Sequence, residues 1–259
     1  MPRIGIGLGL GLFQGGSAFD TDYQAVLNYA TTQGYTLPSA GQRIKQNQLI
    51  VDLKAAGVWN KLDTFAVFAT DGSSSYALID WKRLSQYTAV NSPTFTINQG
   101  FNSNGTSSYI DTNYNASTNG INFQNTDACE GAWVINPISG LLFGTSGGPG
   151  DGVNMANTIG QRLNMFASNI TVSADLSGGD GLRAINRTSA INVVLFNQST
   201  TINRIATVAS RIDGSRRVLN AQNSFLNSAS KCSIYFNGAN LVSEQTNLNN
   251  SLSTYVNSL

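Results

Sequence analysis

The stretch "ACEGAWVI" (residues 128–135) is one of many short runs of β-branched, aromatic and small apolar residues in this chain. Such runs alternate with clusters of Gly, Asn and Ser at intervals of roughly 8–15 residues, a pattern typical of turns between strands. Many short strands with frequent turns predict a mainly β fold, an antiparallel sandwich of the jelly-roll type. The expected strands are residues 62–69, 76–81, 94–97, 108–112, 128–135, 140–145, 161–167, 171–176, 182–186, 191–197, 204–210, 216–221 and 231–237.

Residues 20–61 have helical rather than strand spacing. Asp20 or Thr21 can cap a first helix, because a side-chain oxygen at that position accepts a bond from a free backbone N–H. Ser39, followed three positions later by Gln42, has the pattern of a capping box at the start of a second helix. We therefore expect a small helical region before the sandwich.

The last residues, 241–259, return to helical spacing, with Ser243 as a possible cap. The predicted organisation is an extended N-terminal attachment segment (1–19), a helical collar (20–74) and a concanavalin A-like jelly-roll domain closed by a C-terminal helix (75–259). The apolar stripe of that helix is Leu248, Leu252, Tyr255, Val256 and Leu259.

The N-terminal run "IGIGLGLGLFQGG" (residues 4–16) alternates aliphatic residues with glycine. A phosphate-binding loop requires a preceding strand, and a membrane helix requires about 20 predominantly apolar residues. A signal peptide fits better, although glycine forms helix poorly. We favour an extended segment with one apolar face and one bare face, which pairs either with a partner chain or with its own domain. The residues expected to be buried together are Ile4, Ile6, Leu8, Leu10 and Leu12.

Composition limits the chemistry that this chain of 259 residues can perform. Only 11% of the residues are charged and the net charge is +1, so we expect neither nucleic-acid binding nor membrane insertion. The chain has no histidine and two glutamates, which excludes catalytic triads of the usual form and histidine metal sites. We expect a protein that is not an enzyme and has no cofactor.

Several motifs in order resemble a module of bacteriophage structural and appendage proteins. The segment "LIVDLKAAGVWNKLDTFAVFATDGSSSYALIDWKRL" (49–84) is similar to their helix-to-strand element, and "GFNSNGTSSYIDTNYN" (100–115) resembles the start of their concanavalin A-like, laminin-G-type domain. The ending "GANLVSEQTNLNNSLSTYVNSL" (238–259) resembles their closing helix. The resemblance covers about residues 44–259.

This resemblance implies a structural component of a virion, such as a head fibre, capsid decoration or tail appendage. It implies synthesis in the bacterial cytoplasm, capsid or tail proteins as partners, and homo-oligomeric assembly. The alternative function is a carbohydrate-binding module for a host surface glycan. Of the three tryptophans, Trp59 and Trp133 lie in apolar patterns and are expected in the core, whereas Trp81 is the candidate surface aromatic for glycan binding.

Few acidic residues could serve as glycosidase carboxylates or as metal ligands. A retaining glycosidase needs two adjacent carboxyl groups, but Asp127 and Glu130 would lie on opposite faces of a strand. We therefore interpret Glu130 as a strand-face or salt-bridge residue. Calcium ligands are conceivable, although turn chemistry explains the same aspartates, which are Asp111, Asp151 and Asp180.

Cys129 and Cys232 both fall on expected strands. We interpret them as buried free thiols, with a disulfide as the alternative if their strands pair closely.

Overall fold

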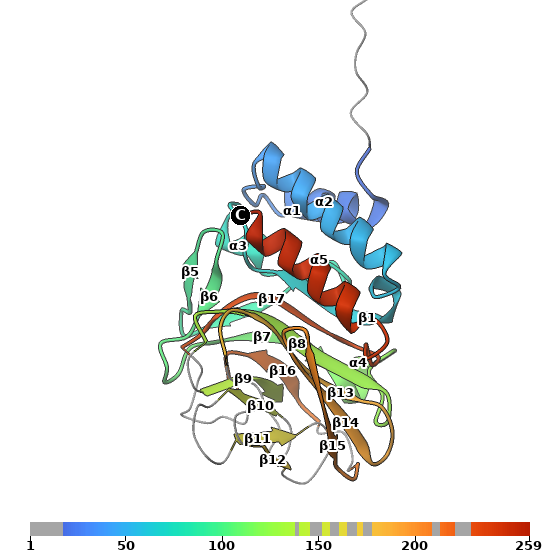
Figure 1. Ribbon diagram of the computed structural model, residues 1–259. Helices are drawn as coiled ribbons and strands as arrows, with labels where there is room; N and C mark the ends of the chain where they lie inside the picture. Colours follow the sequence, from blue (N-terminus) through green and yellow to red (C-terminus); the bar gives the residue numbers. More distant parts are fainter. Residues whose placement is uncertain are drawn as a thin grey trace, which may run out of the picture.

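The computed structural model describes residues 18–137, 140–145, 152–155, 161–164, 170–172, 178–208, 213–220 and 229–259. These residues form three layers, with helices packed over a sandwich of two antiparallel sheets (Figure 1). The predicted mainly β sandwich with a C-terminal helix is confirmed. The predicted attachment residues Ile4, Ile6, Leu8, Leu10 and Leu12 lie outside the described residues.

One sheet, here called the central sheet, lies between the helices and the second sheet (Figure 1). Its strand order is β15-β14-β13-β8-β17-β6-β5, and β1 pairs with β17 beside this path. Its strands are β1 (Leu62–Val67), β5 (Thr94–Thr96), β6 (Gly100–Asn102), β8 (Ala128–Ile135), β13 (Gly181–Arg187), β14 (Asn192–Asn197), β15 (Thr200–Ile205) and β17 (Lys231–Gly238).

The other sheet, here called the outer sheet, has the order β12-β11-β10-β9-β16-β7-β4. Its strands are β4 (Thr88–Val90), β7 (Tyr109–Asn115), β9 (Gly140–Thr145), β10 (Gly152–Met155), β11 (Gln161–Asn164), β12 (Ile170–Val172) and β16 (Ser215–Val218). A further short pair joins β2 (Ile79–Asp80) to β3 (Ser85–Gln86).

The central sheet is buried on both faces, because its side chains alternate between two apolar cores. In β8, Ala132 and Val134 belong to the core between the sheets, whereas Cys129 and Trp133 belong to the core beneath the helices. This double burial explains why residues 128–135 form a nearly continuous apolar run instead of alternating with polar residues.

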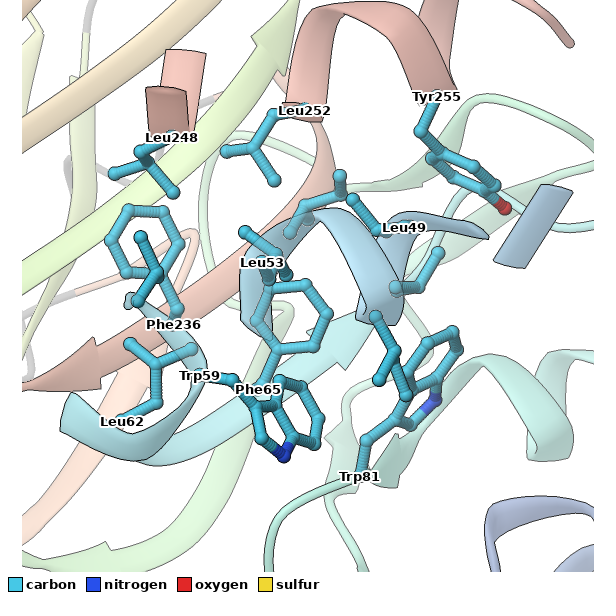
Figure 2. Close-up of a cluster of buried hydrophobic side chains, with 14 of the residues drawn as sticks. Leu49, Leu53, Trp59, Leu62, Phe65, Trp81, Phe236, Leu248, Leu252 and Tyr255 are labelled. Atoms are coloured by element: carbon cyan, nitrogen blue, oxygen red, sulfur yellow. The ribbon is translucent and has the colours of Figure 1, made fainter. Parts of the chain in front are cut away.

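The helical layer consists of α1 (Thr21–Thr32), α2 (Ala40–Ala55) and α5 (Gln245–Asn257), with the short helices η1 (Trp59–Lys61), α3 (Ser74–Ala77) and α4 (Ala116–Asn119) elsewhere. Figure 2 shows the apolar contact of this layer, in which leucines of α2 and α5 lie above aromatic residues of η1, β1 and β17. The labelled side chains are Leu49, Leu53, Trp59, Leu62, Phe65, Trp81, Phe236, Leu248, Leu252 and Tyr255.

No helix in the described part of the chain is both long enough and apolar enough to span a membrane.

Two predicted element boundaries need correction. Residues 76–81 are not one strand, because Ser73 accepts a hydrogen bond from the Tyr76 N–H and starts α3 before the two-residue strand β2. Ser243 does not cap α5, since the helix begins after Glu244 without a side-chain cap. Strand β1, which lies within the predicted collar (20–74), pairs with β17 and shares the apolar cluster of the helices.

The cysteines are free and buried, as expected. Cys129 lies in the core beneath the helices, whereas Cys232 lies in the core between the sheets. Their thiols are therefore on opposite faces of the central sheet, and burial raises the pKa of each thiol above its ordinary value.

Candidate functional site

Trp81, the predicted glycan-binding aromatic, is buried, with an exposed fraction of only 2%. Its ring lies 5.5 Å from the ring of Tyr23 and 5.8 Å from that of Phe65, between centroids. The charged neighbour Asp80 is buried as well and forms an ion pair with Arg83 at 2.6 Å. Trp81 is therefore a core residue of the helical layer, and the prediction that it faces solvent is wrong.

Glu130 projects between the two sheets and forms a buried ion pair with Arg216 of β16. The Arg216 Nε donates to Glu130 at 3.1 Å, and the Tyr235 hydroxyl donates to the same carboxylate. Burial lowers the pKa of Arg216 and raises that of Tyr235. The predicted salt-bridge role of Glu130 is thus confirmed, and the pair joins the two sheets.

Two aspartates are also buried, and both bind backbone N–H groups. Asp63 accepts hydrogen bonds from the Tyr114 hydroxyl at 2.8 Å and from the N–H groups of residues 121–123 at 2.9–3.1 Å. Asp80 accepts from the Phe65 N–H at 3.2 Å, and its burial raises its pKa despite the nearby Arg83. Both carboxylates therefore hold loops and strands in place.

The calcium candidates lie apart in the structure. Asp111 in β7 accepts bonds from the Asn113 N–H at 2.9 Å and from the Ser215 hydroxyl, and Asp180 accepts from the Asn136 N–H at 2.7 Å. Asp151 lies outside the described residues. Within the described ranges, no group of three Asp, Glu, Cys or His side chains is arranged to hold a metal ion.

A groove with a volume of about 430 Å³ separates α5 from one end of the central sheet. This groove, here called the α5 groove, combines residues from four separate parts of the chain. It is lined by Trp133, Ile135, Asp180, Gly181, Gln198, Ser199, Asn249, Ser253, Val256 and Asn257.

The helical wall of the α5 groove comes from one face of α5. Asn249, Ser253, Val256 and Asn257 are spaced by four, three and one positions, which places them on the same side of a helix. The neighbouring stripe of Leu248 and its apolar partners is buried against the sheet and α2. The polar wall is therefore fixed in place by the core packing directly beside it.

The opposite wall includes Trp133 and Ile135 near the end of β8. Trp133 is 6% exposed, so most of its ring belongs to the core and one edge contributes to the groove. The Nε1 of Trp133 and the Oδ1 of Asn249 are buried, and neither has a hydrogen-bond partner among the described residues. A donor and an acceptor without partners beside a groove are unusual, because buried polar groups are normally satisfied.

The third wall is a tight turn between β14 and β15. Gln198 has a φ of +56°, a left-handed conformation that is uncommon for a residue other than Gly, Asn or Asp. Its Nε2 donates to the carbonyl of Asp180 at 3.1 Å. The Gln198 side chain can lie in this position only because residue 181 is glycine, since a Cβ on that residue would come within 2.8 Å of the Gln198 Cγ.

A buried arginine holds the loop beneath this turn. Arg183 donates to the carbonyl of Gly179 at 2.7 Å, and its burial lowers its pKa to about 10. The rim of the α5 groove is thus tied to the sheet by several bonds. The residues that line the groove carry amide, hydroxyl and apolar groups and one carboxylate, that of Asp180. None of these lining residues is a Lys or an Arg.

Sequence reasoning did not single out this groove. Trp133 was correctly placed in the core, but its edge position was not visible in the apolar pattern "GAWVI". The polar residues of α5 resemble an ordinary solvated helix face. The one local signal was the spacing of Asn249, Ser253 and Asn257 beside an apolar stripe.

Comparisons with known proteins find similar folds among solved structures, and they do not identify an activity. No protein-family model and no curated protein sequence matches this chain. Among solved structures, a mutant of Trypanosoma rangeli sialidase displaying trans-sialidase activity matches with a TM-score of 0.55 and 13% identity over 84% of this chain. The same sialidase in complex with sialic acid matches with a TM-score of 0.52 and 12% identity over 81% of this chain.

The chain spans about 40% of the length of these sialidase structures. At this level of identity, the likeness concerns the fold alone.

Proposed function

We propose that this chain is a non-enzymatic structural component of a bacteriophage virion, displayed on the capsid or tail. The absence of enzymatic activity is proposed because the buried carboxylates of Glu130, Asp80 and Asp63 are already bound to other groups of the chain. Glu130 is paired with Arg216, Asp80 is paired with Arg83, and Asp63 binds three consecutive N–H groups. A glycosidase would need carboxyl groups that face a substrate instead.

The attachment part of the proposal rests on the N-terminal run. The described residues from 18 onward bury both faces of the central sheet. We infer that residues 4–12 bind another virion protein as an extended strand, with their aliphatic side chains on one face. Homo-oligomeric assembly is part of the same proposal, since closed symmetry is usual for such components.

Deletion of residues 1–16 tests the attachment. We expect the shortened chain to keep its thermal stability and to be lost from particles, because in this proposal residues 4–12 bind a partner protein and not the chain's own core. The measurement is the amount of the chain in purified particles, compared with a full-length variant in which Thr254, an exposed residue of α5, is changed to Ala. Normal incorporation of the deleted form would contradict the anchor.

A second candidate function is carbohydrate binding, and the α5 groove is the observation that favours it. Its lining is mainly polar, and its amide and hydroxyl side chains lie beside the apolar residues Trp133, Ile135 and Val256. Amide and hydroxyl groups can bond the hydroxyls of a sugar, while apolar side chains can contact its C–H groups. Carbohydrate binding is to be tested on the whole chain, because residues 75–259 alone would lack β1 and the helices α1 and α2, which share an apolar core with α5 and the central sheet.

A further inference from the structure

We propose that the α5 groove is a binding site for an uncharged saccharide. This inference rests on the second candidate function, carbohydrate binding, and gives that function a location and a ligand class. The volume of about 430 Å³ lies within the range of about 300–1,000 Å³ that is usual for small-molecule sites.

The first argument is the chemistry of the lining. A sugar ring presents hydroxyl groups around its edge and C–H groups on its faces. Asn249 and Asn257 each carry both a donor and an acceptor, and Gln198 offers its Oε1 acceptor while its Nε2 is held by backbone carbonyls. Ser253 adds a hydroxyl, which accepts from the Asn257 Nδ2 at 3.0 Å. Ile135, Val256 and the edge of Trp133 supply an apolar surface for the C–H groups.

The second argument is the pair of unsatisfied atoms. The Trp133 Nε1 is a donor and the Asn249 Oδ1 is an acceptor, and both are buried without partners among the described residues. Leaving such buried groups unpaired is unfavourable, because they have lost their bonds to water without gaining others. A sugar carries several hydroxyl groups, each of which can accept or donate, so it offers a partner of the right kind for either atom when side chains at the groove adjust.

The third argument is the strained turn. Gln198 keeps a left-handed backbone although a glycine would adopt it more easily. Its Nε2 is held by the carbonyls of Gly179 and Asp180, at 3.3 Å and 3.1 Å, which fixes the amide at the groove rim. The turn therefore presents a positioned polar group instead of a flexible one.

The charge of the lining decides the class of saccharide. Asp180 is exposed at the rim, and the groove-lining residues include no cationic side chain. The nearby Arg183 is buried, donates to the Gly179 carbonyl at 2.7 Å and does not line the groove, so an anionic sugar in the groove would meet the Asp180 carboxylate first. We therefore assign the groove to uncharged saccharides.

The test begins with the full chain on an array of uncharged bacterial oligosaccharides printed beside sialylated and uronic-acid oligosaccharides. We expect binding to at least one uncharged saccharide and to none of the acidic ones. Affinity for the bound saccharide is then measured by titration calorimetry for Ser253→Trp, which fills the groove, and for Gln198→Gly, which removes the rim amide and suits the left-handed turn. Each change is expected to weaken binding by about tenfold or more, equivalent to about 1.4 kcal/mol.

Thr254→Trp is the matched control, because Thr254 is the next residue of α5, is exposed and is not part of the groove lining. It should bind as the parent does. Unchanged affinity in both groove variants would overturn the site and leave carbohydrate binding standing. Binding of acidic saccharides alone would overturn the ligand class. A parent chain that binds nothing on the array would overturn the inference together with the carbohydrate-binding function.

Discussion

At the scale of single residues, the Glu130–Arg216 pair makes the sharpest prediction. Glu130→Gln leaves the buried Arg216 charge without its counter-ion, and breaking a buried pair in this way costs about 3–5 kcal/mol. The matched control is Glu244→Gln, because Glu244 pairs with a partly exposed Lys61 and such pairs contribute about 1 kcal/mol or less. Equal losses of the free energy of unfolding in urea would contradict the account.

Trp81 shows why single residues were harder to predict than strands. Asp80 and Lys82 flank it in sequence, and charged neighbours usually indicate a surface. Asp80 is itself buried, however, because Arg83 and three backbone N–H groups compensate its charge. The charged residues beside Trp81 therefore did not indicate that its side chain is exposed. The ion pair of Glu130, in contrast, could be expected because a carboxylate inside an apolar strand needs a partner.

At the scale of elements, helix α5 is the part on which the α5 groove depends. Leu252 is fully buried between α2 and the central sheet, and Leu252→Ala is expected to cost about 2–5 kcal/mol. Thr254→Ala on the exposed face of α5 should change the free energy of unfolding by less than about 0.5 kcal/mol. Denaturant unfolding measures both. Similar small effects would mean that α5 is not held by the core.

Helix starts were predictable where the local chemistry was sufficient. Asp20 accepts from the Asp22 N–H at 2.9 Å and Ser39 accepts from the Gln42 N–H at 3.3 Å, as the sequence predicts. The reciprocal half of the capping box is replaced, because the Gln42 side chain donates to the Tyr255 hydroxyl at 3.0 Å. That bond joins α2 to α5, and such a long-range contact has no signal in the local sequence.

At the scale of the whole molecule, we expect the helices and the sandwich to unfold as one unit, because they share an apolar core. A chain of residues 75–259 would lose β1 and expose the apolar face of the central sheet, so we expect it to aggregate or unfold. A chain of residues 18–259 keeps both layers and should show a cooperative thermal transition in near-ultraviolet circular dichroism. Cooperative folding of residues 75–259 alone would restore the helical collar as a separate domain.

The sandwich could be predicted from sequence, because alternating strands and turns are repeated many times along the chain. The α5 groove could not, since it joins residues 133–135, 180–181, 198–199 and 249–257 only after folding. The proposed virion role rests on the order of the sequence motifs and on the N-terminal run. It depends on contacts with other virion proteins, which the structure of a single chain does not contain.

The most direct measurement of that role is quantitative mass spectrometry of particles purified through a density gradient and washed at high salt. The account predicts that this chain sediments with the major capsid protein at a fixed ratio across the particle peak. Its presence only in the unsedimented lysate, with none in washed particles, would contradict the proposal that it is a structural component of a virion.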